Sequence, residues 1–162
     1  MHGCPCGFYG DSVRECTCSL ADIRCYIKKI SGPLLDRIDI NIHVLRLEYS
    51  EITASGVNES STEVRQRVEI ARACQQKRLK QYGLYANAQM GHRHVKNTCK
   101  LTPEAQYLLE QAFEKMNLSG RGYDRTLKVA RTIADLAGEE EINVPAIAEA
   151  IHLRNNVKES VL

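Results

Sequence analysis

Helix start and stop signals divide the second half of the chain and constrain its fold more than any other feature. In "LTPEA", Thr102 suits the N-cap, Pro103 suits the first helical position, and Glu104 faces the positive end of the helix dipole. "LSGRGYDR" opens the next helix, which Gly138 is expected to end. These signals predict one helix from about residue 103 and another up to Ala137.

Two further helices complete the pattern. One runs from Ser61 or Thr62 to about Tyr82, where Gly83 is expected to end it, and the last begins near Asn143–Pro145. Because 43% of the residues are hydrophobic, the chain can bury a core. We therefore expect a mainly α fold with a four-helix bundle in its C-terminal part. The three clearest apolar faces are Val64, Val68 and Ala71; Ala105, Leu108, Leu109, Ala112, Phe113 and Met116; and Tyr123, Leu127, Ala130, Ile133, Ala134 and Ala137.

Residues 19–48 predict one helix and one strand. Ser19 can cap a helix that runs to about Lys29, with Asp22 in its first turn. In "RIDINIHVL", apolar and polar residues alternate, which is typical of a strand over 38–45. A single strand cannot satisfy its own hydrogen bonds, so either its partners lie outside this chain or it packs in an unusual way, and the chain has the character of the end of something larger. We expect domain boundaries at 1–48, a polar linker at 49–60, and a helical domain at 61–162.

Four cysteines near the start form two C-x-C pairs on a glycine-rich loop. They are Cys4, Cys6, Cys16 and Cys18. Four thiolates suit tetrahedral zinc, and they leave no position open for water, so the predicted zinc is structural. The sequence shows no export signal, which favours a reducing cytoplasm, where clustered cysteines bind metal rather than pair. The alternative is a tail with free thiols. Ordinary core or surface positions are expected for Cys25, Cys74 and Cys99.

Charge and hydropathy exclude some classes of function. The net charge is +2, so no global field favours nucleic acid or a membrane. No apolar run approaches the roughly 18 residues of a membrane span. The basic helix that begins at about residue 61 can bind the phosphates of nucleic acid. It can equally be a solvated face that matches an acidic neighbour in a ring. Its basic residues are Arg65, Arg67, Arg72, Lys77, Arg78 and Lys80. In "GHRHV", His92 and His94 are expected to be solvated in a loop, without a nearby carboxylate.

Several motifs together resemble one family. They are "CPCG" with the second C-x-C pair, "KISGPLLDRIDI", "NAQM" at Asn87–Met90, "SGRGYDRTLKVARTIADLAG" at Ser119–Gly138, and "IAEAIHLR" at Ile147–Arg154. In this order they resemble the magnesium-chelatase-like AAA+ ATPases of bacteria, the ComM/YifB type, over about residues 3–155. The resemblance implies a C-terminal portion of such a protein. It would contain the end of the α/β ATPase core with a Cys-rich insertion, followed by the helical lid.

The resemblance also implies roles for two arginines. From the residues alone, an ordinary surface ion pair of Asp36 and Arg37 is favoured over an arginine displayed at a subunit edge. By resemblance, Arg37 is the arginine that AAA+ rings present to the nucleotide of the neighbouring subunit, where it would stabilise charge on the γ-phosphoryl group. Arg125, or less well Arg121, resembles the sensor 2 arginine, which contacts the γ-phosphate bound to its own subunit. Otherwise we expect Arg121 and Arg131 to be solvated helix charges.

For the full-length protein the resemblance implies ATP hydrolysis with magnesium. It further implies a hexameric ring of like subunits in the cytoplasm, acting on DNA by branch migration in natural transformation. DNA is therefore a candidate partner, and no membrane is expected.

The sequence departs from the family in two respects. It contains no G-x-x-x-x-G-K-[ST] and no acidic Walker B strand, so we expect no ATPase activity from this chain alone. His2 stands where the family has an asparagine that resembles a nucleotide sensor. The competing interpretation is a stand-alone, zinc-dependent module that binds nucleic acid or protein. A third is a domain that caps or regulates a ring made by another chain.

Overall fold

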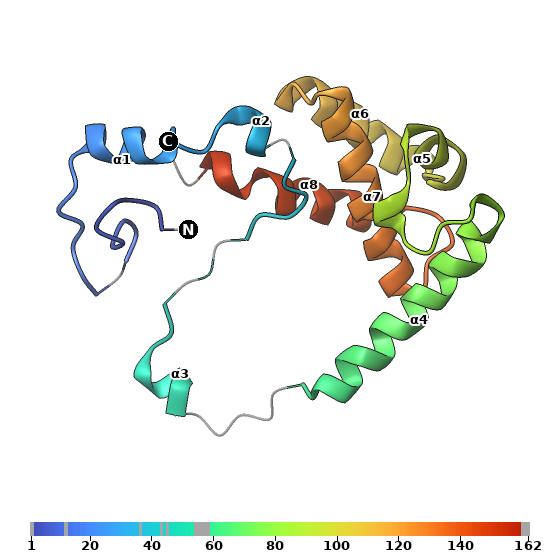
Figure 1. Ribbon diagram of the computed structural model, residues 1–162, viewed down its shortest axis with the longest axis horizontal. Coiled ribbons are helices and arrows are strands. Elements are labelled where there is room, and N and C mark those ends of the chain that lie inside the picture. Colours follow the sequence, from blue (N-terminus) through green and yellow to red (C-terminus); the bar gives the residue numbers. More distant parts are fainter. Residues whose placement is uncertain are drawn as a thin grey trace. The chain divides into compact units, whose positions relative to one another are not determined.

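A computed structural model describes residues 2–11, 13–35, 37–42, 44, 46–53 and 59–159. The chain separates into two compact units (Figure 1). We call residues 1–56 with 154–162 the cysteine unit, and residues 57–153 the helical unit. Within the described ranges, helices are the only extended regular elements, and one isolated parallel bridge joins Leu101 to Ile142. The prediction of a mainly α fold is therefore confirmed.

The cysteine unit contains three short helices, α1 (Leu20–Ile27), α2 (Gly32–Leu35) and α3 (Tyr49–Thr53). α1 begins as predicted. The Ser19 hydroxyl accepts a hydrogen bond from the Asp22 backbone N–H at 3.2 Å, and the Asp22 carboxylate accepts one from the Ser19 backbone N–H at 3.2 Å. This reciprocal pair is a capping box. α3 lies inside the predicted linker 49–60, of which Ala54–Asn58 fall outside the described residues.

The strand predicted over 38–45 is wrong. The described residues of this segment, 38–42 and 44, form no strand, while His43 and Leu45 fall outside the description. Ile40, Ile42 and Val44 are 52%, 67% and 79% exposed. The alternation of apolar and polar residues favours a strand, but a strand forms only beside another strand that completes its hydrogen bonds. The described part of this chain contains no second strand.

The helical unit contains α4 (Ser61–Leu79), α5 (His92–Thr98), α6 (Pro103–Met116), α7 (Gly120–Ala137) and the first turns of α8 (Val144–Glu159). Short 3-10 helices, η1 (Lys80–Tyr82) and η2 (Asn87–Gln89), follow α4. Gly83 and Gly138 have φ of 67° and 76° and end η1 and α7, so both predicted stops are confirmed. Periodicity missed α5, which is only seven residues long.

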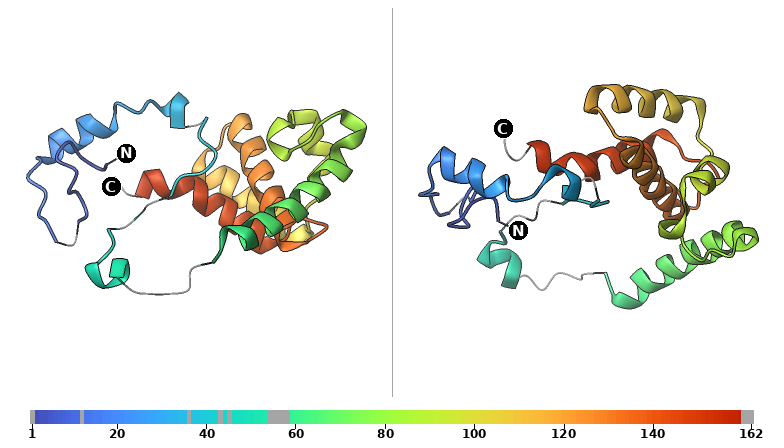
Figure 2. Two further views of the ribbon diagram at one scale, coloured as in Figure 1. Left: turned by 60° about the horizontal axis from the view of Figure 1, so that its bottom comes forward. Right: turned by 45° about the horizontal axis from the view of Figure 1, so that its top comes forward.

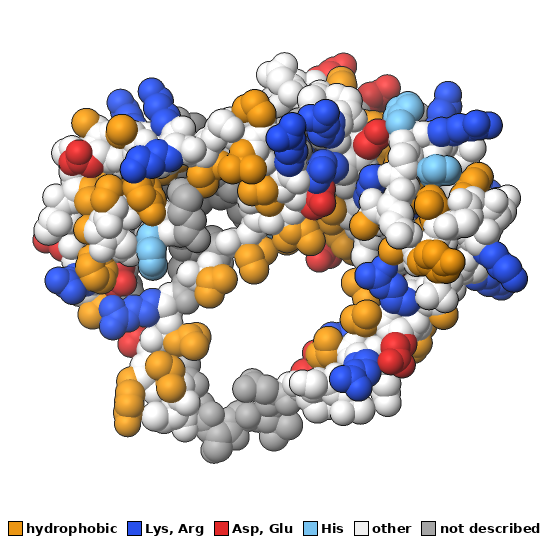
Figure 3. Space-filling view, in the orientation of Figure 1, with side chains coloured by type: hydrophobic (Ala, Val, Ile, Leu, Met, Phe, Trp, Pro, Cys, Tyr) orange, Lys and Arg blue, Asp and Glu red, His pale blue; other side chains and the backbone are white. Residues whose placement is uncertain are grey.

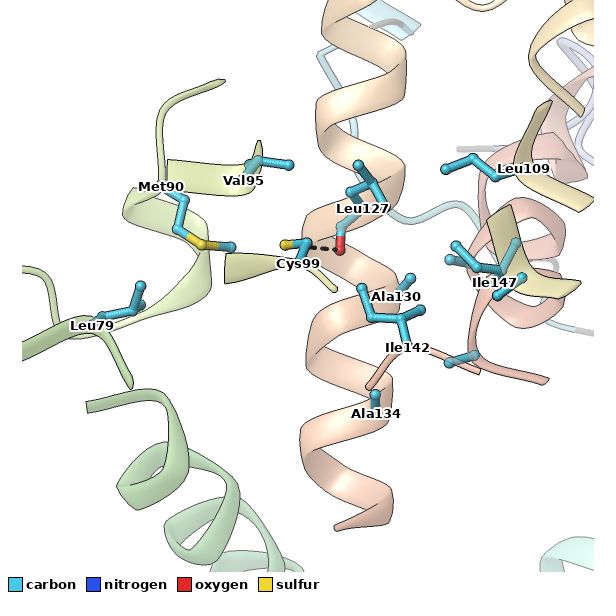
Figure 4. Close-up of a cluster of buried hydrophobic side chains, with 13 residues drawn as sticks. Leu79, Met90, Val95, Cys99, Leu109, Leu127, Ala130, Ala134, Ile142 and Ile147 are labelled. Carbon is cyan, nitrogen blue, oxygen red and sulfur yellow. Dashed lines mark hydrogen bonds between the residues drawn. The ribbon is translucent and has the colours of Figure 1, made fainter. Parts of the chain in front are cut away.

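α7 is the central helix of this unit. It packs against α4, α5 and η2, and the views agree on this placement (Figures 1 and 2). Around it lies the hydrophobic core, to which α4, α5, α6, α7 and α8 all contribute side chains (Figure 4). The largest buried apolar members are Leu79, Met90, Val95, Leu109, Leu127, Ile142 and Ile147.

The apolar stripe predicted on α4 is buried at only one of its three positions. Ala71 is buried, whereas Val64 and Val68 are 39% and 44% exposed. Burial instead continues toward the C-terminal end of the helix, at Gln75 and Leu79. The first turns of α4, residues 61–70, are exposed at every position.

Removing the N-cap of α6 tests the contribution of its start signal. The Thr102 hydroxyl accepts a hydrogen bond from the Ala105 backbone N–H at 3.3 Å. We expect Thr102→Ala to lower the free energy of unfolding by about 1 kcal/mol, because this N–H loses its acceptor. Urea denaturation followed by circular dichroism measures the change. Thr102→Ser keeps the acceptor and should remain close to the parent, and equal losses in both variants would contradict the capping role.

Candidate metal centre and buried ionic network

The two C-x-C pairs lie together at one point of the cysteine unit. The four Sγ atoms of Cys4, Cys6, Cys16 and Cys18 all lie within 4.8 Å of one another. Three of the separations are 3.2 Å (Cys4 to Cys6), 3.5 Å (Cys6 to Cys16) and 3.6 Å (Cys4 to Cys16). All seven cysteines are free thiols. The sequence therefore identified four residues that the fold brings together.

Tight turns of the loop bring the first pair toward the second. Gly7 and Gly10 have φ of 86° and 79°, a conformation that favours glycine. The Gly7 N–H donates to the Cys4 carbonyl at 3.2 Å, and the Tyr9 N–H donates to the Cys4 Sγ at 3.3 Å. Cys4 is the buried member of the cluster, at 1% exposure. The loop thus holds one thiol in place through its own backbone.

The thiols also differ in acidity. A hydrogen bond from the Phe8 backbone, followed by one from the Cys4 thiol, lowers the pKa of Cys6 to about 6. A backbone hydrogen bond from Cys18 acts to lower the pKa of Cys16, but burial and the contacts with the Cys6 and Cys4 thiols outweigh it and raise this pKa to about 12. The pKa of Cys18 is raised for similar reasons. The Cys6 thiol therefore ionises readily, whereas the Cys16 and Cys18 thiols resist further negative charge.

The arrangement has the dimensions of a four-thiolate zinc site. With a Zn–S distance of about 2.3 Å, a tetrahedron places its sulfurs about 3.8 Å apart. The observed separations of 3.2–3.6 Å and the limit of 4.8 Å bracket this value. A divalent cation would also neutralise thiolates that repel one another. Donor type, donor number and spacing all fit a metal of this class.

A second cluster of polar groups is buried in the helical unit, around Asp135 of α7. Arg78 of α4 donates to both Asp135 carboxylate oxygens at 2.7 Å, and Arg131 Nε donates to one of them at 3.1 Å. The Asn87 amide of η2 donates to the same carboxylate at 2.8 Å. Asp135 and Arg131 are 4% and 1% exposed. This network joins α4, η2 and α7.

Arg131 corrects a prediction from the sequence. It was expected to be a solvated helix charge, but it is among the most buried side chains. Its guanidinium donates to the backbone carbonyls of Glu139 and Glu140 at 2.6 and 2.7 Å, in addition to Asp135. The side chain therefore fastens the turn after α7 to the helix. Its partner four residues along the helix was visible in the sequence, but its burial was not, because it depends on packing against other elements.

The histidine prediction also needs correction. His92 and His94 lie on α5 rather than in a loop, and His92 Nδ1 lies 2.9 Å from an Asp124 carboxylate oxygen. His94 Nδ1 accepts a hydrogen bond from the Gly91 backbone N–H at 3.0 Å. Asp124 lies 32 residues away in the chain, and the packing of α5 on α7 brings its carboxylate close to His92. The local sequence around the histidines therefore did not reveal this carboxylate.

The predicted nucleotide-contacting arginines occupy separate units. Arg37 is exposed in the cysteine unit, and its neighbour Asp36 falls outside the described residues. Arg125 is half-buried on α7 and Arg121 is exposed on the same helix, both in the helical unit. Through the described part of the chain, none of the helices combines the length and the apolar character that crossing a membrane requires.

A helical domain preceded by a four-cysteine loop defines the class of this chain, and comparisons with known proteins agree. The family model described as "Magnesium chelatase, subunit ChlI C-terminal" matches residues 58–154, and that described as "Magnesium chelatase, subunit ChlI" matches residues 1–52. The chain therefore belongs to the magnesium-chelatase-like family, as its motifs predicted.

Curated relatives extend the match over most of the chain. The chain is 36% identical over 159 residues to competence protein ComM of Haemophilus influenzae, which covers 98% of the chain and 30% of that protein. It is 34% identical over 155 residues to the uncharacterized protein YifB of Escherichia coli, covering 95% and 29%. An uncharacterized protein of Mycobacterium tuberculosis is 36% identical over 151 residues, covering 93% and 29%. The chain spans about three tenths of the length of these relatives.

Proposed function

We propose that this chain provides the C-terminal part of a magnesium-chelatase-like AAA+ ATPase. The observation that carries this proposal is the match of two family models in succession, over residues 1–52 and 58–154. We assign residues 1–48 to the end of the ATPase core, 49–60 to a linker and 61–162 to the helical lid. The boundary between the two compact units after residue 56 lies within this linker and supports the assignment there, whereas residues 154–162 group with the cysteine unit.

We propose that the cysteine cluster holds a structural zinc ion. The four Sγ atoms within 4.8 Å of one another support this, as do the low pKa of Cys6 and the burial of Cys4. Four thiolates complete the coordination of zinc, so the metal would fix the loop and would not bind substrate. This site would give the cysteine unit the stability that its small apolar core does not provide.

Arg37 and Arg125 are our candidates for the residues that contact nucleotide. In an assembled ring, Arg37 would reach the γ-phosphate bound to a neighbouring subunit, and Arg125 would act as sensor 2 toward the nucleotide of its own subunit. The exposure of Arg37 leaves it accessible, and Arg125 lies on the central helix α7. A guanidinium suits both roles because it stays protonated and offers a planar fork to phosphate oxygens.

For the whole protein we propose ATP hydrolysis with magnesium, in a cytoplasmic hexameric ring that acts on DNA. The name of the Haemophilus relative, a competence protein, supports a task in natural transformation, and we propose branch migration of DNA as that task. The phosphate cradle and the magnesium ligands would come from sequence outside these 162 residues, which contain no P-loop motif.

The alternative is a zinc-dependent interaction module that acts without ATPase activity. One observation favours it, because all four metal ligands lie within this chain. The alternative predicts tight binding of DNA by the isolated chain, with a steep dependence on salt. Weak binding or none is the expectation for a part of a larger motor, and a salt titration of DNA binding separates the two.

Restoring ATP hydrolysis by mixing tests the main proposal. The chain alone should hydrolyse no ATP, and turnover should appear when it is combined with a polypeptide that carries the family's P-loop core. Arg37→Ala should then lower turnover about a thousandfold, because the charge that develops on the γ-phosphoryl group loses its stabilising arginine.

Arg24→Ala provides the matched control for this assay. Arg24 is also an exposed arginine of the cysteine unit, on α1, and its removal should leave turnover unchanged. Turnover by the chain alone would overturn the proposal, and so would equal losses in the two variants.

A further inference from the structure

The helical unit carries an acidic groove between α6 and α7. We define the α6–α7 groove by its apolar residues Leu109, Phe113 and Tyr123 and its acidic residues Glu110, Glu114 and Asp124. Its volume is about 620 Å³. Leu109 is buried at the base, while Phe113 is 40% exposed and packs edge-on against Tyr123 with ring centroids 6.0 Å apart. The groove therefore combines an apolar floor with carboxylates.

The groove has a negative electrostatic character. Burial, followed by the charges of Asp124, the Cys99 thiol and Glu110, raises the pKa of the Tyr123 hydroxyl above its ordinary value. His92 is the basic side chain at the groove, and it is held by Asp124 at 2.9 Å. A ligand of this groove should therefore present apolar side chains beside positive charges.

A second surface of the same unit has the complementary composition. We define the α4–α7 patch by its apolar residues Val64, Val68 and Leu136 and its basic residues Arg65 and Arg72. Val68, Arg72 and Leu136 line a shallow hollow of about 230 Å³. The three apolar side chains of the patch are 39%, 44% and 45% exposed. Figure 3 shows hydrophobic and charged side chains, basic ones among them, along α4.

The helical geometry of α4 explains why this patch is uncovered. Val64, Val68 and Arg72 recur at a spacing of four residues, so they lie on one face of the helix. This is the face that, further along, buries Gln75 and Leu79. Burial on this face of α4 begins at Ala71 and continues toward the C-terminal end of the helix. Toward the N-terminal end, over residues 61–70, the same face is exposed.

The groove and the patch of one molecule cannot meet. Gly120 of the groove and Leu136 of the patch lie at opposite ends of α7, and sixteen residues of helix at 1.5 Å each place them about 24 Å apart. α7 has no break along this length. An interaction between these surfaces therefore requires a second molecule.

We propose that the α4–α7 patch of one copy docks into the α6–α7 groove of another copy of this chain. Val64 and Val68 would cover the apolar floor, and Arg65 and Arg72 would face Glu110 and Glu114. The charge complementarity of two surfaces on the same chain favours this occupant over an unrelated partner. Because the two surfaces differ, the contact is head-to-tail, and in a pair one copy keeps an unused groove while the other keeps an unused patch.

This arrangement deepens the self-association part of the proposed function and rests on it. Repeated head-to-tail contacts generate a ring when the rotation closes and a filament when it does not. Each single contact is small compared with the interfaces of stable complexes, so the isolated chain should associate weakly. Its association should weaken as salt rises, because exposed charges attract one another across the contact.

Complementary charge reversal tests the contact. Sedimentation equilibrium of the full chain at low salt should show association that increases with concentration. The groove variant Glu110→Arg with Glu114→Arg should weaken association at least about tenfold, and so should the patch variant Arg65→Glu. Mixing the two variants should restore association between unlike chains, because the intact patch of the groove variant can dock into the intact groove of the patch variant.

Glu149→Arg is the control, because Glu149 is an exposed carboxylate of α8 that belongs to neither surface. It should associate like the parent. Circular dichroism of every variant shows whether the helices are intact. A parent chain that stays monomeric across the micromolar to millimolar range would overturn this inference, as would a mixture of variants that fails to associate. Neither outcome would affect the result of the ATPase mixing assay, so the two proposals fail separately.

Discussion

Replacing Asp135 by alanine is expected to lower the free energy of unfolding of the helical unit by about 3–5 kcal/mol. The carboxylate accepts hydrogen bonds from three side chains, those of Arg78, Arg131 and Asn87. Its removal leaves the Arg131 guanidinium, which is 1% exposed, without its counter-charge. A buried charge that loses its partner is far more destabilising than the pair was stabilising.

The direction of the pKa shifts agrees with this dependence. Burial lowers the pKa of Arg131 from its ordinary value, against the opposing effect of the Asp135 charge. For Arg78, burial also acts to lower the pKa, but the hydrogen bonds and charge of Asp135 outweigh it and raise the pKa. Asp135 is therefore the group whose charge opposes the cost of burying both guanidiniums.

Urea denaturation measures the effect, and an exposed pair provides the control. Arg67 also makes two hydrogen bonds to one carboxylate, that of Glu59, at 2.6 and 3.0 Å. The Arg67 and Glu59 side chains are 56% and 44% exposed. Glu59→Gln should therefore change the denaturation midpoint little, because water screens this pair. Similar losses for the two substitutions would show that burial of the Asp135 network is not what makes it stabilising.

Removing zinc is expected to unfold the cysteine unit while the helical unit stays folded. Among the described side chains of the cysteine unit, Cys4 and Ile23 are the only buried hydrophobic residues. So small a core cannot hold a chain of this length, and small domains of this kind need a metal or other cross-link. Zinc bound by four thiolates contributes about 10–16 kcal/mol of apparent binding free energy, which becomes folding free energy.

Metal analysis and hydrogen exchange measure this expectation. The purified chain should contain about one zinc ion. A chelator should remove amide protection from residues 2–30 and leave that of α6 and α7 unchanged.

Cysteine variants sharpen the test, because the chain offers matched controls. Cys6→Ser should abolish zinc binding, since Cys6 lies 3.2 and 3.5 Å from two other thiols of the cluster. Cys25→Ser and Cys74→Ser remove exposed thiols outside the cluster and should retain the metal. A metal content near zero in the parent chain, or equal content in all three variants, would refute the zinc site.

The sequence predicted the ends of helices better than it predicted which side chains are buried. Ser19, Thr102, Gly83 and Gly138 act as expected, because caps and stops depend on residues within a few positions of one another. Periodicity likewise predicted the apolar faces of α6 and α7. It failed for α5, whose seven residues are too few to show a pattern.

Contacts between distant segments explain the errors. The 38–45 segment has the alternation of a strand, but a strand forms only with a partner, and the described residues supply none. His92 has a carboxylate neighbour only because α5 packs on α7. Arg131 is of a charged residue type that is expected at the surface. It is buried because other parts of the helical unit pack around it, and its guanidinium donates to the carbonyls of the turn after α7.

By itself, the sequence determined the family, most of the helix starts and stops, and the four cysteines of the candidate metal site. Each of these depends on residue type and short-range spacing, which a sequence displays directly. Only the tertiary structure decided that the cysteine sulfurs meet, that Asp135 joins α4, η2 and α7, and that Val64 and Val68 stay exposed. These features depend on which segments far apart in the chain come into contact, because burial and hydrogen-bond partners are properties of the packed molecule.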